Sequence, residues 1–246
     1  MKTIEFGKDE NKTTEGRLTR VPTKYYPAMK RFIEENVKAG RLRPSSSSTS
    51  SGTFMTPKSD PTVDPRLVHD YRALNENTIK DHTPLPRQDA ILERMVRAFI
   101  RGKMDLKDAF YQIRIREGDI YKTAIKTPFG LFEWVVMPQG LCNAPATFQR
   151  YMNFILREYI GEFCDPFMDD IGIYSNLVAE HKRHVALILE VLRDHGIVAS
   201  EKKSILFADH IEFLGHVISS KGIEPSSENL GKISSWPTPR SASDIK

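Results

Sequence analysis

The chain has 246 residues, of which 39% are hydrophobic and 28% are charged, and its formal net charge is +4. It has no apolar run near the roughly 18 residues that a membrane helix needs, and its N-terminus lacks the apolar stretch of a signal peptide. We therefore expect an intracellular protein, cytoplasmic or nuclear, with no membrane partner. The two cysteines, Cys142 and Cys164, form neither a disulfide framework nor a metal-ligand spacing.

The N-terminal part of the chain predicts a leader, a helix and two strands. Residues 1–24 are polar and unpatterned, as in a flexible leader. Residues 25–44 predict a helix that Gly40 ends. Its apolar residues recur at helical spacing: Met29, Phe32, Ile33 and Val37. The serine-rich segment that ends at Thr53 predicts a loop. Residues 54–75 favour two short strands around a turn rich in proline and aspartate.

The middle of the chain predicts a helix, a strand and a hairpin. Residues 83–102 indicate a helix with one apolar face, made of Ile91, Leu92, Met95 and Phe99. Residues 103–115 begin as a strand and then turn. Residues 121–140 predict a hairpin with "TPFG" as its turn.

The remaining segments alternate between helix and hairpin without regular βαβ units, which favours the α+β class. Residues 143–161 predict a helix with Asn143 as its N-cap. Its inward residues are Phe148, Met152, Ile155 and Tyr159. Residues 162–175 predict a second hairpin. Residues 176–196 form the longest amphipathic pattern, which Gly196 ends, and strands or turns follow at 210–219 and 221–226. His181 and His184 in that pattern favour an exposed polar face over a zinc site.

The segment "EFCDPFMDDIGIYS" places Asp169 and Asp170 side by side between apolar runs. Adjacent carboxylates on an apolar hairpin repel each other, and a hard cation such as Mg²⁺ would offset that repulsion. Asp105 is the best third carboxylate, with Asp108 as its rival. Three carboxylates around two metal ions indicate phosphoryl or nucleotidyl transfer. The alternative is a surface residue at Asp105 and an ordinary turn at the pair.

Five segments, in order, resemble motifs of one family. They are "VHDYRALNENTIKDHTPLPR", "KMDLKDAFYQIRI", "KTPFGLFEWVVMPQGLCNAPATFQRYMN", "FMDDIGIYS" and "EFLGHVISSKGIEP". The chain closely resembles the reverse transcriptase of gypsy-type long-terminal-repeat retrotransposons, from about Tyr26 to Pro239. Phe167 stands where the family's box has tyrosine, and Pro166 stands in a strand where proline is poorly tolerated if the strand is central.

The resemblance implies the fingers and palm of a right-hand polymerase, with a mainly antiparallel palm sheet backed by helices and no thumb. Residues 25–104 are then mainly fingers. Residues 105–235 are mainly palm, with a fingers hairpin at about 113–136 interleaved. Residues 236–246 are the start of a linker towards the missing thumb.

The resemblance also implies a set of site residues. The catalytic carboxylates are Asp105, Asp169 and Asp170, and the carbonyl of Leu106 completes the metal site. The residues expected to contact the nucleotide are Leu106, Phe110, Gln139, Gly140, Arg66 and Lys58. Among these, the ring of Phe110 would exclude a ribose 2′-hydroxyl. The segment expected to grip the primer is Phe213, Leu214, Gly215 and His216.

The implied activity is RNA-directed DNA synthesis with Mg²⁺, for which Mn²⁺ could substitute. Its partners would be a primed RNA or DNA template and deoxynucleotide triphosphates. One alternative is an inactive, truncated retroelement relic that retains nucleic-acid binding, which Pro166 and the missing thumb favour. Another is a palm-type nucleotidyl transferase that acts on DNA templates.

Overall fold

The structure, a computed structural model, describes residue 16, residues 21–58, residue 60 and residues 63–236. The predicted leader and the predicted C-terminal linker lie largely outside these residues. The chain forms two compact units, one from residues 1–84 and 108–151 and the other from residues 85–107 and 152–246. The assignment of fingers and palm to particular residues stays a prediction.

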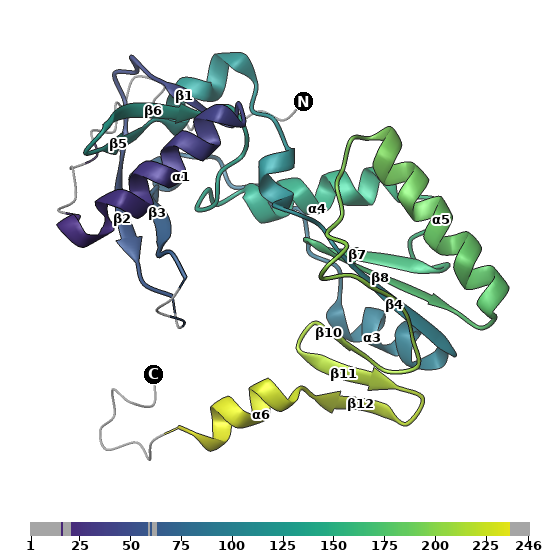
Figure 1. The fold of residues 1–246 in the computed structure, drawn as a ribbon. Coiled ribbons are helices and arrows are strands. Elements are labelled where there is room, and N and C mark those ends of the chain that lie inside the picture. The colour runs from purple at the N-terminus through teal and green to yellow at the C-terminus, as the bar shows by residue number, and fades with distance from the viewer. Residues whose placement is uncertain (1–15, 17–20, 59, 61–62, 237–246) are drawn as a thin grey trace. The chain divides into compact units, whose positions relative to one another are not determined.

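The first unit is built around a five-stranded sheet with the order β1-β6-β5-β2-β3 (Figure 1). Its strands are β1 (Leu42–Pro44), β2 (Ser51–Thr56), β3 (Arg66–Asp70), β5 (Ile125–Thr127) and β6 (Gly130–Trp134). Its helices are α1 (Tyr26–Lys38), α2 (Arg72–Glu76) and the N-terminal part of α4 (Ala144–Ile155), with 3₁₀ turns at Thr23–Tyr25, Ala109–Gln112 and Glu117–Thr123. The two predicted hairpin strands at 121–140 are present as β5 and β6, which pair in antiparallel fashion.

The prediction of a loop for the serine-rich segment is wrong from Ser51 on, where β2 begins, whereas residues 45–49 lie outside any strand or helix. β2 lies between β3 and β5, and Ser51 and Thr53 are buried there. The Thr53 hydroxyl donates a hydrogen bond to the carbonyl of Lys126 at 2.9 Å. Small hydroxyl side chains can therefore occupy an interior strand once their polar atoms have partners. In α1, Met29 and Ile33 are buried as expected, whereas Val37 is exposed.

The second unit contains two antiparallel sheets, with the orders β7-β8-β4-β9 and β10-β11-β12. Its strands are β4 (Ile100–Asp105), β7 (Cys164–Phe167), β8 (Asp170–Ser175), β9 (Ile205–Ala208), β10 (Ile211–Phe213), β11 (His216–Ser219) and β12 (Gly222–Pro225). Its helices are α3 (Gln88–Arg97), the end of α4, α5 (Val178–Asp194) and α6 (Ser227–Ser234). The α+β class is confirmed.

Helices α3 and α5 both pack against β8 (Figure 1). They do so on opposite faces, because Gly102 approaches His181 of α5 while Gly172 approaches Met95 of α3. Ile91, Leu92 and Met95 of α3 are buried as predicted. Phe99, however, is 70% exposed, because α3 ends at Arg97 and β4 follows at once.

Pro166 lies on an edge strand, because β7 is at the end of the sheet order β7-β8-β4-β9. Proline lacks an N–H group and is tolerated at a sheet edge, where only one side of the strand needs ladder hydrogen bonds. The register from Cys164↔Ile173 to Phe167↔Asp170 runs through Pro166 without a shift. The proline therefore does not displace the aspartates.

Three further expectations are wrong in detail. Asn143 precedes α4 and its carbonyl accepts the Thr147 N–H at 2.8 Å, as expected of an N-cap, but its side chain bonds to the backbone of Ile79 and Asp81 instead of capping the helix. The predicted helix at 143–161 ends at Ile155, before Tyr159. His181 is buried rather than exposed, because its ring nitrogens bond to the Ser175 hydroxyl and the Leu206 carbonyl.

None of the helices in the described part of the chain combines the length and apolar character that crossing a membrane requires.

Candidate active site

The acid pair sits at the turn between β7 and β8. Phe167 pairs with Asp170, so Met168 and Asp169 form a two-residue turn. Met168 has φ 53°, a left-handed conformation that favours glycine. A hairpin of this kind needs a positive φ at its first turn position, and the sequence supplies a methionine there. Strained backbone of this kind often clusters at functional sites.

The register of the sheet brings Asp105 to this turn. Asp105 is the last residue of β4, and it lies directly opposite Asp170 on β8. The next residue, Leu106, donates its backbone N–H to the carbonyl of Asp169 at 2.8 Å. The three acids that the sequence singles out therefore meet at one end of the sheet.

Asp108, the rival to Asp105, belongs to the first unit and has another partner. Its backbone is left-handed, with φ 49°. Its carboxylate lies 3.1 Å from Arg41 Nη2. Asp108 therefore pairs with Arg41, whereas Asp105 lies opposite Asp170.

Two lysines face the acids, and sequence reasoning missed both. Lys103 Nζ lies 3.2 Å from Asp170 Oδ1, and Lys203 Nζ lies 3.5 Å from Asp105 Oδ1. The Lys103 side chain is 24% exposed and the Lys203 side chain 71%, so only the first ion pair is shielded from water. The signal for Lys103 is its position two residues before Asp105, which puts both side chains on one face of β4.

Burial and the neighbouring charged groups together shift the pKa of Asp170. Burial raises the pKa of its carboxyl group, Lys103 lowers it, and Asp169 and Asp105 raise it again. The net direction is upward. A cation placed among the acids would reverse this shift, because it favours their charged forms.

The donor chemistry of the site suits Mg²⁺, a hard ion that prefers oxygen ligands. Asp105 Oδ1 and Asp170 Oδ1 are buried, and the lysine ammonium group beside each oxygen does not meet hydrogen-bond geometry. Within the described residues, no three acid, histidine or cysteine side chains are already placed to hold a metal ion. Asp169 is exposed, so its side chain would have to turn to join the other two. The residues therefore fit Mg²⁺ through the type of their ligand atoms, which are carboxylate oxygens, and through their negative charge.

A loop before β9 holds the backbone of Asp105. The Asp105 N–H donates to Ser204 Oγ at 3.1 Å, and the Ser200 N–H donates to the Asp105 carbonyl at 2.7 Å. Leu106 forms a bridge with Ala199. These serines fix the end of β4, and no sequence motif indicated them.

Apart from Leu106, which lies in the second unit, the residues expected to contact a nucleotide belong to the first unit. Arg66 begins β3 opposite Thr56, the last residue of β2, and Lys58 follows two positions later. Both side chains are exposed at this open end of the hairpin. The Phe110 ring packs edge-on against Phe148, with centroids 5.8 Å apart.

The segment with Gln139 and Gly140 is held by Asn75 of α2. The Asn75 amide donates to the Gly140 carbonyl at 2.8 Å and accepts the Cys142 N–H at 2.8 Å. Gly140 has φ 101°, and an added Cβ would lie 3.3 Å from the Tyr71 ring. Gln139 itself is exposed.

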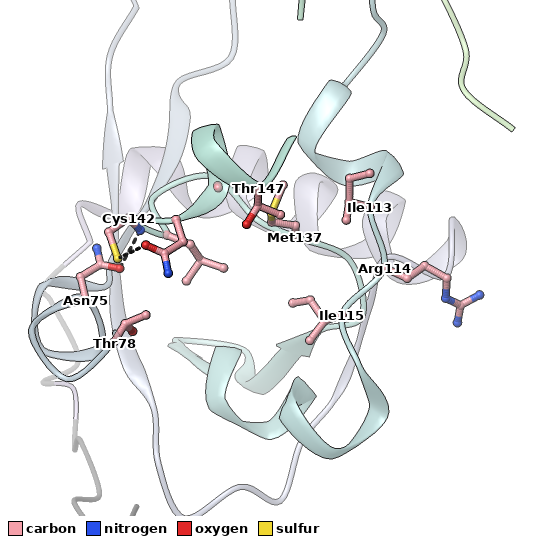
Figure 2. A pocket seen from close by; sticks show the side chains of 11 residues that line it. Asn75, Thr78, Ile113, Arg114, Ile115, Met137, Cys142 and Thr147 are labelled. Carbon is pink, nitrogen blue, oxygen red and sulfur yellow. Dashed lines mark hydrogen bonds between the residues drawn. The ribbon is translucent and has the colours of Figure 1, made fainter. Parts of the chain in front are cut away.

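Asn75 and Cys142 also line a pocket of the first unit. Figure 2 shows Asn75, Thr78 and Cys142 on one side and Ile113 and Ile115 on the other, with the Arg114 side chain directed away.

The expected primer-contacting segment is a tight hairpin between β10 and β11. Phe213 pairs with His216, and both turn residues are left-handed, Leu214 with φ 50° and Gly215 with φ 76°. Phe213 is fully buried, and its ring would lie 3.3 Å from a Cβ added at Gly172. This hairpin therefore touches β8, the strand that carries Asp170.

The family model described as reverse transcriptase (RNA-dependent DNA polymerase) matches residues 56–218. The chain belongs to this family. The predicted resemblance to reverse transcriptases of gypsy-type retrotransposons is confirmed.

The chain is similar to the transposon Tf2-3 polyprotein of Schizosaccharomyces pombe, with 34% identity over 234 residues. That alignment covers 92% of this chain and 17% of the polyprotein. The Tf2-7 polyprotein of the same organism is 33% identical over the same length. The chain thus spans about a sixth of the curated relatives that it matches.

Solved structures of a foamy viral protease-reverse transcriptase have the same fold. The complex with double-stranded DNA matches with a TM-score of 0.89 and 26% identity, over 100% of this chain and 43% of that chain. The complex with an RNA/DNA hybrid matches with a TM-score of 0.88 and 26% identity, over 100% of this chain and 33% of that chain. The predicted fingers-and-palm fold class is therefore confirmed.

Proposed function

We propose that this domain is an RNA-directed DNA polymerase that extends a primer with deoxynucleotides. The observation that carries the proposal is the pairing of Asp105 with Asp170 across β4 and β8, with Asp169 at the adjoining turn. In a member of the reverse transcriptase family, this arrangement gives oxygen ligands at one end of a rigid sheet. The primer 3′-hydroxyl would attack the α-phosphate in line, and pyrophosphate would leave.

Asp105, Asp169, Asp170 and the carbonyl of Leu106 would hold Mg²⁺, or Mn²⁺ in its place. The bound ions would supply charge neutralisation at the phosphates and a more acidic primer hydroxyl. Ser200 and Ser204 fix the backbone of Asp105, so its carboxylate is placed before substrate arrives. Lys103 offsets part of the acid charge in the absence of other cations.

The first unit would select and hold the nucleotide. Arg66 and Lys58 would pair with the triphosphate, because exposed cations attract phosphate oxygens. Phe110 would exclude a 2′-hydroxyl through its ring. Gln139 and Gly140 would contact the incoming nucleotide and the template, on the segment that Asn75 holds.

Phe213, Leu214, Gly215 and His216 would position the primer strand. Their hairpin is stiff, because Phe213 is buried and the His216 ring Nδ1 donates to the Leu214 carbonyl at 2.9 Å. The partners would be a primed RNA or DNA template and deoxynucleotide triphosphates.

Primer extension on matched RNA and DNA templates tests the proposal. Asp105→Asn and Asp169→Asn should each lower the extension rate by about 10²-fold or more, because each removes a ligand charge at the reacting phosphate. Asp194→Asn, an exposed change at the end of α5, is the matched control and should extend like the parent.

Extension that survives both Asp105→Asn and Asp169→Asn would contradict the site. A parent that binds primer–template but extends neither template with Mg²⁺ or Mn²⁺ would favour the inactive binding domain. Extension on DNA templates alone would favour the DNA-templated transferase.

A further inference from the structure

An ion pair with a buried carboxylate joins α3 to the strand that leads into the acid turn. Arg94 donates from Nε to Asp165 Oδ2 at 2.8 Å and from Nη2 to Oδ1 at 2.9 Å. The Tyr174 hydroxyl on β8 donates to the same Oδ2 at 2.9 Å. The Asp165 side chain is only 3% exposed. One carboxylate therefore ties a helix to both strands of the hairpin.

These groups share a face of the sheet with the acids. Asp165 lies opposite Gly172, and Phe167 lies opposite Asp170, so side-chain alternation puts all four positions on the face that α3 covers. A Cβ added at Gly172 would meet Met95 Sδ at 3.0 Å and the Phe213 ring at 3.3 Å. Helix α3 thus holds β7 through Arg94 and contacts β8 through Met95.

Strand β7 needs a tether beyond its own ladder. It is the edge strand of its sheet, so the ladder with β8 supports it along one side. Asp165 immediately precedes the proline and lies four positions before Asp169. The ion pair therefore acts on an edge strand, close to the turn that sets the position of the acids.

We propose that Arg94 and Asp165 are positioning residues, which fix the acid hairpin on α3 and so set Asp169 and Asp170 against Asp105. This inference rests on the proposed polymerase function. Neither residue needs to touch substrate for this role. Arg94 acts through Asp165, and Asp165 acts through the backbone of β7.

The chemistry of the pair suits this role. A guanidinium held by two parallel hydrogen bonds fixes both distance and rotation, which an apolar contact does not. Burial keeps the Tyr174 hydroxyl protonated by raising its pKa, so it remains a donor to Asp165. A displacement of about 1 Å at reacting groups can lower a rate by about 10²-fold, so a small loosening of the hairpin is measurable.

Three variants separate positioning from simple stability. Arg94→Met removes the fork but leaves a buried carboxylate. Arg94→Met combined with Asp165→Leu removes both charges, and such apolar replacements commonly restore stability. Arg97→Met is the matched control, since Arg97 lies on the same helix and pairs with Glu93 at the surface.

Two readouts are measured for each variant. The first is the single-turnover extension rate with its nucleotide KM, and the second is hydrogen exchange of the backbone amides from 164 to 175. Arg94→Met should lower the rate about 10- to 100-fold with KM nearly unchanged, because the acids move while the nucleotide contacts do not. Exchange at 167–170 should rise about tenfold, since the turn opens more often.

The double variant should regain thermal stability and still extend slowly, with fast exchange at the turn. Recovery of the parent rate and exchange in the double variant would overturn the proposal, as would parent-like values in Arg94→Met. A parent without any extension would contradict the proposed function instead. Exchange at 167–170 would then decide the positioning role alone, with Arg97→Met as its reference.

Discussion

At the residue scale, three features at the acid turn each cost folding free energy, as is common at functional sites. Met168 adopts a left-handed backbone, Asp170 is half-buried with a raised pKa, and Asp105 has a buried oxygen without a hydrogen bond. Each cost is local and of the kind that surrounding structure must overcome. The shared location of all three at one end of β4 and β8 is what favours a site for cations.

The first residue-scale prediction concerns Met168. Replacing it with glycine should stabilise the fold by about 1 kcal/mol, because a left-handed residue with a Cβ costs roughly that amount. Urea unfolding of Met168→Gly beside Tyr174→Phe, which loses a hydrogen bond instead, measures this. A loss of stability in Met168→Gly would mean that the methionine side chain contributes more than its backbone costs.

The second residue-scale prediction concerns pH and His69 of β3. Burial lowers the pKa of His69 to about 3, from an ordinary value of 6.5. Between these values the unfolded chain binds a proton that the folded chain does not, so stability falls as the pH drops from 6.5 towards 3. His69→Leu should remove this part of the acid sensitivity.

Trp134 gives a direct probe, since its ring lies 5.5 Å from that of His69. Urea unfolding followed by Trp134 fluorescence, in a Trp236→Phe background, should show a weaker pH dependence for His69→Leu than for the parent. The exposed His82→Gln change serves as the control. An equal pH dependence in His69→Leu and the parent would contradict the assignment.

At the scale of elements, two arginines join helix α3 to the sheet, the partly exposed Arg94 and the buried Arg101. Arg94 pairs with Asp165, and Arg101 of β4 is fully buried without a carboxylate partner. The Arg101 guanidinium donates to the carbonyls of Met95 and Val96 at 2.7 and 2.9 Å, and to that of Asp209 at 2.6 Å. The last carbonyls of a helix lack intrahelical partners, and Arg101 supplies them.

The element-scale prediction is that Arg101→Lys destabilises the protein by about 3 kcal/mol. One ammonium cannot reach all of these carbonyls, and each buried group left without a donor costs about 1–3 kcal/mol. Chemical unfolding of Arg101→Lys and of the exposed Arg193→Lys measures the difference. Equal stability of the two variants would contradict the capping role.

Hydrophobic periodicity predicted the elements that have one apolar and one polar face. The helix at 178–194 and both hairpins follow regular patterns, and the structure contains them. The patterns failed where tertiary contacts replaced local rules. Ser51 and Thr53 enter a strand because neighbouring strands satisfy their polar atoms, and the side chain of Asn143 bonds to a distant loop instead of capping its own helix.

At the scale of the whole molecule, the sheet order creates the candidate site. β4 lies between β8 and β9. Asp105 therefore faces the acid turn on the β8 side, and on the β9 side it bonds to the loop that contains Ser200 and Ser204. The chain enters this sheet at three separated places. Nothing local in the segment around Asp105 specifies its partner strand, which is set only when the whole sheet has formed.

The whole-molecule prediction concerns salt. If the domain binds primer–template through phosphate contacts, its affinity should fall about tenfold or more between about 50 and 200 mM salt, as expected for two or more released counterions. Fluorescence anisotropy with a labelled duplex measures this. Asp105→Asn should bind at least as tightly as the parent, because it removes a negative charge. Affinity independent of salt would contradict phosphate-led binding.

The sequence by itself determined the family, the α+β class and the choice of Asp105, Asp169 and Asp170, because short motifs with fixed chemistry and clear periodicity are local properties. Only the tertiary structure decided how Pro166 is accommodated, which lysines face the acids, and that Arg94 holds Asp165. These outcomes depend on strand order and on which helix covers which face. Such contacts join residues far apart in the chain, and hydrophobic patterning constrains faces but leaves the partners open.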